Sequence, residues 1–568
     1  MNQNAPAQAL AALAEQYWDF ESFESPFSAL LAGEKTHDAT LFRESPADYD
    51  RKAATAATLL QTLNGIADQP LDAQDMATAK LMQRELRKIV DFHEVKAHLR
   101  PSLYPAGPDF NLRYWANSAH ANSSEAARQY LDRLATVTAF LGDLRASLEA
   151  GREFGFRYPS FVLERATAAV RAGIAPSAAD SPLMGPFQRS PLGESPAVRE
   201  AAVQAAGLID NKILPALSDY ATFLEQDLGP SGRDSIACAD DPLGEEYYEL
   251  LVRNFTSLDA EADEIHQLGL DEVERVHADI ESVATEAGFN GDVAAYQQYV
   301  TQDPAFVSPD PATHLQAVQV ICKEIDLLVP SFFSQVPRIT YGVRLIPEAL
   351  SDSMPPAYAQ PSPADNSAPG VFWLSGIPAK CPTWFYRSLA LHEAWPGHLM
   401  QIALMQEQMD LPKFRRNGAL KYTACIEGWA MYCESLGTEM GIYQSPHDHF
   451  GRLLGEMWRA VRLVVDTGIH ARNWSRQKAL QYAVERVAIP VETLEAEIDR
   501  YIALPGQALA YQPGNLKFRE LRRRAESRLG DQFDVRQFHN QLISCGPVTL
   551  PILDQLMEHW MATQGEAA

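Results

Sequence analysis

Two histidines and a glutamate lie close together in the stretch HEAWPGH, residues 392–398. Neutral imidazole nitrogens are common ligands of zinc, and a carboxylate beside a metal can take a proton from a water molecule. His392 and His398 are therefore candidate metal ligands. Glu393, which directly follows the first histidine, is a candidate general base.

The spacing of these histidines is wider than in the H-E-x-x-H pattern, in which two histidines bind one zinc ion. Histidines four positions apart differ by about 40° around a helix, whereas positions six apart differ by about 240°. Pro396 lacks a backbone N–H and would clash with the carbonyl of His392, and Gly397 adds conformational freedom. We therefore expect the helix to break inside the motif, with two residues looped out so that His398 returns to the face of His392. The alternative is two unrelated histidines near a helix end.

A third candidate ligand is Glu427, in the helical stretch KYTACIEGWAMYCESLGTEMG, residues 421–441. Its neighbours are mostly apolar, so an unpaired carboxylate would be costly there and a metal ion would compensate its charge. Glu434 falls on the same helical face. It either orients a metal ligand or is a core carboxylate with its own partners.

A further polar cluster lies in WRAVRLVVDTGIHARNWS, residues 458–475. Arg462, Asp466 and His470 are spaced by four, so they stack along one helical face. The intervening residues are apolar, which indicates a buried helix in which these polar side chains need partners. The stripe is either part of the site or an ordinary ion-paired helix face.

The turn-rich stretch ALPGQALAYQPG, residues 503–514, adds Gln507 and Tyr511. A phenol positioned there could donate a hydrogen bond to an oxyanion.

Apolar residues recur at three- and four-residue spacing along most of the chain, which predicts a mainly helical fold. Ser123 is the expected N-cap of one helix and Gly151 its expected end. The spacing predicts helices over 75–99, 123–151, 197–228 and 245–288.

Stretches rich in proline and glycine predict long connections over 174–196, 228–244 and 346–370. The one strand that we predict is VFWLS, residues 371–375. It either runs along a substrate backbone or packs at the edge of the core. We expect an N-terminal helical region over 1–240 and a helical catalytic region over 241–568, which are either separate or one continuous fold.

The composition narrows the class of protein. Of 568 residues, 46% are hydrophobic and 21% charged, which is typical of a soluble globular protein. A net charge of −26 argues against binding to nucleic acid or to anionic membranes. The oligomeric state stays open.

The six cysteines form no C-x-x-C pair, so the sequence indicates neither a thiolate zinc site nor a thioredoxin-like motif. The first residues lack the basic start and apolar core of a secretory signal, and no apolar run approaches the roughly 18 residues of a membrane span. We therefore expect a cytoplasmic protein.

Four ordered blocks together resemble a bacterial family known as Domain of Unknown Function 885. They are HEAxPGHxxQ (392–401), EGWAxYxE (427–434), DTGxHxxxWS (466–475) and PGQALAY (505–511). Members look like zincin-type metallopeptidases of the gluzincin kind, in which a glutamate on the next helix completes the zinc site. The resemblance implies a large helical zincin-like body around a deep cleft, with only a small β element near 371–375.

Our hypothesis from the sequence is a zinc-dependent hydrolase of peptide or related amide bonds. His392, His398 and Glu427 would hold Zn²⁺ with an open position for water, and Glu393 would act as the general base.

Three further side chains have predicted roles toward the substrate, which would be a peptide or a small amide. His470 and Tyr511 would donate hydrogen bonds to the oxyanion, and Arg462 would bind a substrate carboxylate.

Two alternatives stay open. The first is a metal-dependent lyase or amidohydrolase that acts on one small metabolite. The second is a non-catalytic helical protein that binds a metal or a peptide.

Overall fold

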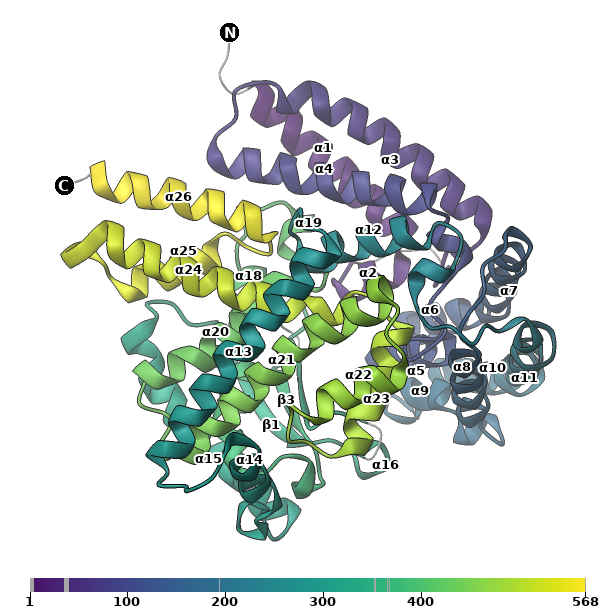
Figure 1. Ribbon diagram of the computed structural model, residues 1–568. Helices are drawn as coiled ribbons and strands as arrows, with labels where there is room; N and C mark the ends of the chain where they lie inside the picture. Colours follow the sequence, from purple (N-terminus) through teal and green to yellow (C-terminus); the bar gives the residue numbers. More distant parts are fainter. Residues whose placement is uncertain are drawn as a thin grey trace.

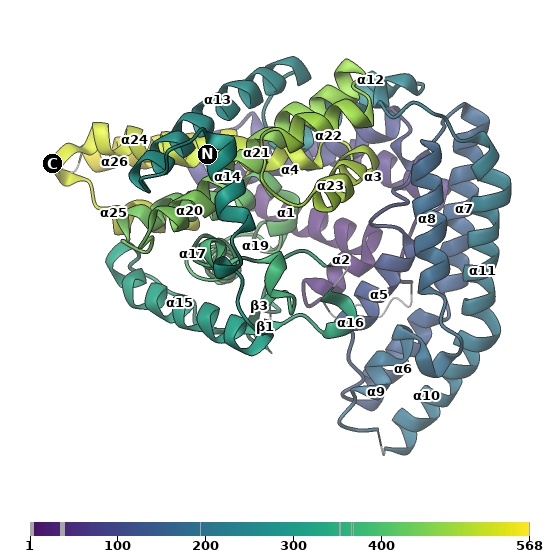
Figure 2. The same cartoon turned by 60° about the horizontal axis from the view of Figure 1, so that its bottom comes forward.

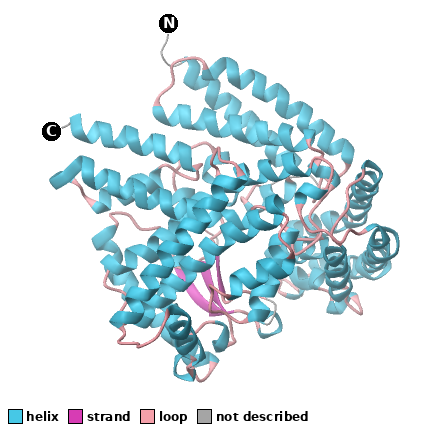
Figure 3. Cartoon of the chain, viewed as in Figure 1, coloured by secondary structure: helices cyan, strands magenta, loops and turns pink. Residues whose placement is uncertain are grey.

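The computed structural model describes residues 5–34, 40–193, 195–351, 354–364, 366 and 368–566. These residues form a mainly helical molecule with one small sheet (Figures 1 and 3), which confirms the predicted fold class. Over these ranges, no helix combines the length and the apolar character that crossing a membrane requires.

The helices of the N-terminal part precede residue 223. They are α1 (Ala5–Glu24), α2 (Pro26–Leu31), α3 (Pro46–Ala67), α4 (Ala73–Glu94), α5 (Pro108–Ser118), α6 (Ser124–Leu134), α7 (Val137–Phe154), α8 (Ser160–Gly173), α9 (Gly185–Gln188), α10 (Pro196–Leu208) and α11 (Leu214–Thr222).

The remaining helices and the strands follow residue 243. They are α12 (Gly244–Thr256), α13 (Ala262–Glu286), α14 (Val293–Gln302), α15 (Pro311–Phe332), β1 (Tyr341–Leu345), α16 (Glu348–Ser351), β2 (Ala357–Gln360), β3 (Gly370–Leu374), α17 (Tyr386–Glu393), α18 (His398–Gln406), α19 (Lys413–Arg416), α20 (Thr423–Glu439), α21 (Pro446–Arg472), α22 (Arg476–Val484), α23 (Val491–Ala503), α24 (Tyr511–Leu529), α25 (Val535–Ser544) and α26 (Leu550–Glu566).

The predicted helices are present, but two of them are interrupted, and the one predicted over 75–99 ends at Glu94 as α4. The stretch 197–228 is helical throughout, because π-helical turns join α10 to α11 and extend α11 to Leu228. The stretch 123–151 forms α6 and α7, and the stretch 245–288 forms α12 and α13. The apolar spacing continues across both breaks, which is why the sequence pattern did not reveal them.

One predicted cap is confirmed and one predicted helix end is wrong. The side chain of Ser123 accepts a hydrogen bond from the Ala126 N–H at 3.0 Å and so caps α6. Gly151 lies inside α7, which ends at Phe154 and is capped by Gly155 with a φ of 115°. A Cβ on Gly151 would lie 2.1 Å from the carbonyl oxygen of Leu99, so close packing of two chain segments requires the glycine.

The largest hydrophobic core unites both ends of the chain. It contains apolar side chains of α1, α3 and α4 together with those of α15, α17, α18, α20 and α24 to α26. Polar contacts cross the same boundary: Lys80 of α4 donates to Gln555 of α26 at 2.6 Å. The fully buried Arg415 donates to Thr78 of α4 and to the Cys545 carbonyl oxygen. This core spans the predicted division near residue 240.

A second core belongs to the helices between residues 103 and 228. Their apolar side chains pack mainly against one another. Figure 2 shows α6 to α11 gathered at one side of the molecule, opposite the C-terminal helices α24 to α26.

The sheet has the strand order β1-β3-β2, so the predicted strand is its central member. Strand β3 pairs in parallel with β1 and antiparallel with β2, and Phe372 and Leu374 are fully buried. Both hydrogen-bonding edges of β3 are therefore occupied. This arrangement excludes a substrate backbone paired with β3 and agrees with the alternative of a core strand.

Helices α20 and α24 approach each other backbone to backbone. A Cβ on Gly514 would lie 1.9 Å from the Ala424 carbonyl oxygen and 2.7 Å from the Cα of Gly428. A Cβ on Gly428 would lie 2.4 Å from the Cα of Gly514. Only glycine at both positions allows this contact, which sets the distance between the two helices.

We expect Gly514→Ala to lower the free energy of unfolding by about 1–3 kcal/mol, because the new methyl group forces the two helices apart. Urea unfolding followed by circular dichroism measures the change. The matched control is Gly207→Ala at an exposed helical position with no atom within 4 Å of the new Cβ. The control should stabilise the protein by roughly 0.5–1 kcal/mol. Equal stability of the two variants would contradict the predicted steric conflict.

Candidate metal centre

The helix that carries the histidine motif is interrupted within it, as predicted. Helix α17 ends at Glu393 and α18 begins at His398, and the residues between them form a turn. Ala394 has φ −87° and ψ −134°, outside the helical region. The rings of His392 and His398 thereby meet edge to face, with centroids 4.7 Å apart.

Helix α20 holds this turn in place. The Trp429 indole donates to the Pro396 carbonyl oxygen at 2.9 Å, and the Cys433 thiol lies 3.6 Å from the same oxygen. A Cβ on Gly397 would lie 2.0 Å from the His392 carbonyl oxygen, so the turn requires glycine there. The neighbouring Trp395–Pro396 peptide bond is cis.

The structure brings the three predicted ligands together. Ligand atoms of His392, His398 and Glu427 all lie within 4.8 Å of one another. The Nε2 atoms of His392 and His398 are 3.4 and 3.6 Å from Oε2 of Glu427. These distances exceed those of ordinary hydrogen bonds. Two ligand atoms that each lie about 2.1 Å from one tetrahedral zinc ion are separated by about 3.4 Å.

The polar side-chain atoms of His392, His398 and Glu427 are largely buried, so leaving them without a further partner costs free energy. His392 and His398 are 4% and 8% exposed, and the Glu427 side chain is 19% exposed. Nδ1 of His398 and Oε2 of Glu427 are buried, and neither atom forms a hydrogen bond within the part of the chain that the structure describes. A cation bound between the three residues would satisfy the carboxylate oxygen, so the donor set fits a metal ion.

The electrostatics of the three residues are strongly coupled. Burial alone would lower the pKa of His392, but its contacts with Glu427 and Glu434 raise it to about 9. Burial alone would raise the pKa of Glu427, but the two histidines hold it well below its ordinary value. Glu427 thus favours positive charge on the two histidines, and a cation bound between the three residues would satisfy the same attraction.

Glu434 contacts His392, the first candidate ligand, from the side opposite Glu427. Its Oε1 lies 2.8 Å from Nδ1 of His392, and its Oε2 accepts a hydrogen bond from Ser388 at 2.6 Å. Nη2 of Arg459 lies 3.7 Å from Oε1. A carboxylate that holds the outer nitrogen of a histidine fixes the ring and leaves the other nitrogen for a metal. This geometry matches the predicted orienting role of Glu434.

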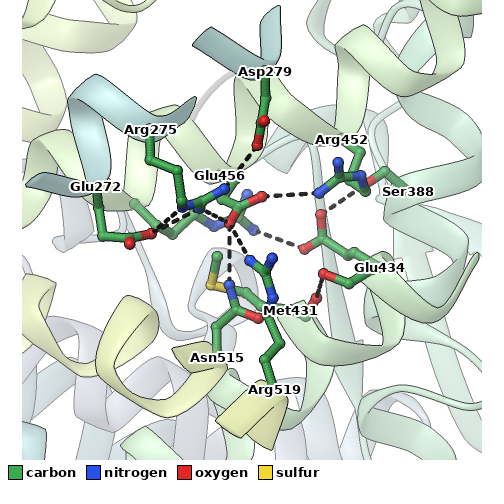
Figure 4. Close-up of polar contacts among 12 residues, drawn as sticks. Glu272, Arg275, Asp279, Ser388, Met431, Glu434, Arg452, Glu456, Asn515 and Arg519 are labelled. Atoms are coloured by element: carbon green, nitrogen blue, oxygen red, sulfur yellow. Dashed lines mark hydrogen bonds and ion pairs between the residues drawn. The ribbon is translucent and has the colours of Figure 1, made fainter. Parts of the chain in front are cut away.

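A buried network of charges lies behind Glu434 (Figure 4). At its centre Glu456, 3% exposed, accepts hydrogen bonds from Arg275, Arg452 and Arg519. Burial opposes the ionisation of Glu456, yet these arginines hold its pKa below the ordinary value. The network joins α13, α21 and α24 around the helix that carries Glu427 and Glu434.

Glu393 is the last residue of α17 and is 7% exposed. Its carboxylate makes no hydrogen bond or ion pair with any residue in the described ranges. Its charge contributes to the raised pKa of the adjacent His392. A buried carboxylate next to a ligand and without a fixed partner is available to exchange a proton.

Tyr511 and Arg462 lie beside the triad. Burial and the charge of Glu427 raise the pKa of Tyr511, whereas Arg462 lowers it. The Arg462 guanidinium carbon lies 4.7 Å from the centre of the Tyr511 ring. The Tyr511 ring therefore contacts Arg462, and the charge of Glu427 acts on its hydroxyl group.

His470 is placed differently from the prediction. Its Nδ1 accepts a hydrogen bond from the Cys238 N–H at 3.3 Å, and its Nε2 donates to the Tyr501 carbonyl oxygen at 3.0 Å. Burial lowers the pKa of His470 to about 4, so its ring is neutral. Neither nitrogen is left for an oxyanion, and the ring instead braces the end of α23.

Asp466 also contacts residues outside the candidate site, near the end of α23. It accepts hydrogen bonds from Tyr248 at 2.7 Å and from the Gly506 N–H at 3.0 Å. Burial raises the pKa of Asp466 to about 7. The conspicuous polar stripe of α21 therefore fixes the turn that leads to Tyr511.

Sequence reasoning missed several partners of the site: Ser388, Arg459, Glu497 and Tyr501. Each lies far along the chain from the residue that it contacts, and no local spacing pattern points to it. Tyr248 falls in a helix that the sequence predicts, but only its contact with Asp466 reveals its role.

Comparisons with known proteins place the fold among solved structures. The chain is similar to a crystal structure described as a "putative lipoprotein" from Colwellia psychrerythraea. The TM-score is 0.91 and the identity 26%, over 98% of this chain and 99% of that one. A "putative lipoprotein of unknown function" from Shewanella oneidensis shares the fold, with TM-score 0.75 and 17% identity, over 96% of this chain and 99% of that one. No curated protein matches the chain. A family model described as "Bacterial protein of unknown function (DUF885)" matches residues 26–557.

We expect Glu434→Gln to weaken zinc binding by about 10- to 100-fold, because the variant loses the charge that holds His392. Competition against a chromophoric chelator measures the affinity. The control is Glu439→Gln on the same helix, where an exposed carboxylate pairs with Arg522 at 3.2 Å. Equal zinc affinity of the two variants would show that Glu434 does not act on the ligand.

Proposed function

Because the chain belongs to the DUF885 family, which is described only as bacterial proteins of unknown function, we propose an activity from its own site. The proposed activity is zinc-dependent hydrolysis of peptide or related amide bonds, by a zincin-like arrangement of ligands and base. The observation that carries the proposal is the convergence of His392, His398 and Glu427 at ligand spacing, with buried atoms that lack partners.

The position of the base also supports hydrolysis. Glu393 directly follows the first ligand in the chain, is buried and makes no fixed contact in the described ranges. A site built only to store a metal would not need an additional free carboxylate there. Three protein ligands leave a fourth position at a tetrahedral metal for a water molecule or a substrate.

The proposed mechanism assigns one role to each residue. A bound zinc ion would polarise the scissile carbonyl group and lower the pKa of an attacking water molecule. Glu393 accepts a proton as the water oxygen bonds to the carbonyl carbon, and delivers that proton to the amide nitrogen as the C–N bond breaks. Tyr511 donates a hydrogen bond to the carbonyl oxygen as negative charge develops on it.

We expect protein purified without a tag or added zinc to contain about one zinc ion per chain. His398→Ala should lose the metal, because two ligands remain. Elemental analysis of the purified proteins measures the content. The control is His277→Ala, at an exposed position of α13, which should keep its zinc. An unchanged zinc content in His398→Ala would refute the proposed metal site.

We expect Glu393→Gln to keep its zinc and to lose at least about 100-fold in turnover, the contribution of a general base. Mass spectrometry of a mixed peptide library incubated with each protein detects new cleavage products. Unchanged cleavage by the variant would exclude Glu393 as the base. Zinc binding without cleavage by either protein would favour a non-catalytic metal protein.

We also propose that the protein acts in the cytoplasm. Its six cysteines are all buried and unpaired thiols, which suits a reducing compartment. The structures that it resembles are described as lipoproteins, and an anchored protein would be found in the envelope. Fractionation of cells that express the chain from its own gene should recover it with a cytoplasmic marker enzyme. Recovery with an envelope lipoprotein marker would overturn this location.

A further inference from the structure

Two arginines beside the candidate metal centre share one carboxylate. Arg462 donates through Nη2 to Glu497 at 2.9 Å and through Nε to the Tyr501 hydroxyl at 2.9 Å. Arg500 donates to both oxygens of Glu497, at 3.0 and 2.9 Å. We refer to Arg462, Arg500 and Glu497 as the arginine pair and its carboxylate.

This cluster carries an excess positive charge. Both arginines keep Glu497 ionised and hold its pKa at about 2, although burial works in the opposite direction. One carboxylate compensates only one of the two guanidinium groups. Asp466 also interacts electrostatically with Arg500, but burial favours its neutral form and raises its pKa to about 7. A positive charge in so confined a place attracts an anion.

Arg462 retains a free donor in a fixed position. Its guanidinium lies 4.8 Å from the Trp458 ring and 4.7 Å from the Tyr511 ring, which restrict its movement. Nη1 makes no hydrogen bond to any residue in the described ranges, and it is not among the buried atoms without partners, so solvent reaches it. A planar guanidinium with an open edge is the preferred group for binding a carboxylate.

The cluster is one side chain away from the metal centre. Tyr511 contacts Arg462 and lies within the field of Glu427, a candidate metal ligand. Tyr511 begins α24, one turn before Gly514, which packs against Gly428 next to Glu427. We therefore place a substrate with its carbonyl group at the metal and its chain directed along Tyr511 toward Arg462.

We propose that Arg462 recognises a free carboxylate of the substrate, so that the enzyme cleaves amide bonds next to a terminal acidic group. This inference rests on the proposed function and names its substrate class: short peptides or acylated amino acids cleaved close to a free carboxylate. Arg500 and Glu497 are positioning residues that hold Arg462.

The test uses three short hydroxamates, whose zinc-binding end is the same in all three. The far end is a free α-carboxylate, a primary amide, or an α-amide with an aspartate side chain. Calorimetry on the zinc-loaded full-length protein measures each affinity. The α-carboxylate probe should bind about 10- to 100-fold more tightly than the amide, which is the range for one charge-assisted hydrogen bond. Tighter binding of the aspartate probe than of the α-carboxylate probe would assign the site to an acidic side chain instead of a chain end.

Substitutions in the arginine pair and its carboxylate test which residue causes the preference for the carboxylate probe over the amide probe. Arg462→Met should abolish it, and Arg462→Lys should keep part of it because the charge remains. Glu497→Gln should strengthen it, since the countercharge is lost. The matched control is Arg472→Met, which removes an exposed arginine from the same helix and should leave the preference unchanged.

The outcomes separate this inference from the proposed function. Equal affinity for the carboxylate and the amide, or an unchanged preference in Arg462→Met, would overturn the role of Arg462 and leave the metal site intact. Arg462 would then only connect α21 to α23 through its contacts with Glu497 and Tyr501. If none of the hydroxamates binds the zinc-loaded protein, the open metal position is refuted, and the substrate assignment falls with it.

Discussion

The site depends on one geometric constraint: two side chains six positions apart cannot share a face of a continuous helix. The chain resolves this by ending α17 at Glu393 and starting α18 at His398. Such an interruption leaves backbone groups without helical partners. The Trp429 indole satisfies one of them at the Pro396 carbonyl, so the helix that supplies the third ligand also stabilises the break. The break between α17 and α18 and the position of Glu427 on α20 therefore depend on each other.

Around this break the molecule buries an unusual number of charges. Glu434 and Glu456 are each about 3% exposed, and isolated carboxylates at such depth would be strongly destabilising. Arginines from α13, α21 and α24 compensate them, and the contacts link helices that are distant in sequence (Figure 4). Such a network is sensitive to displacement, because moving one member leaves another uncompensated. It therefore gives His392 a rigid support that apolar packing alone would not provide.

Local chemistry in the sequence was enough to predict the helical class, the break at Pro396 and Gly397, and the grouping of Glu427 with the two histidines. The helical class follows from the apolar spacing and the break from steric rules. The grouping of Glu427 follows from the cost of burying charge together with the resemblance to gluzincin-type enzymes. The breaks inside 123–151 and 245–288, the strands that flank β3 and the brace made by His470 could not be predicted. The apolar spacing runs across both breaks, so the sequence pattern does not show them. The strands and the brace depend on partners far along the chain: β1 and β2 beside β3, and the Tyr501 carbonyl at His470. The Leu99 carbonyl against Gly151 likewise explains a glycine inside α7 that the sequence pattern placed at a helix end. The sequence shows that Arg462, Asp466 and His470 form a polar stripe on α21. It does not show whether these side chains bind backbone groups or a substrate.

The core shared by the first and last helices has a consequence for biosynthesis. Helices α1, α3 and α4 share one hydrophobic core with α24 to α26, and α4 packs against α26, which leaves the ribosome several hundred residues later. During translation the early helices have no native surface to cover them, and contacts of such long sequence separation form slowly. The nascent chain thus exposes the apolar faces of α1, α3 and α4 for most of its synthesis, and a chaperone that binds exposed apolar surface would protect them.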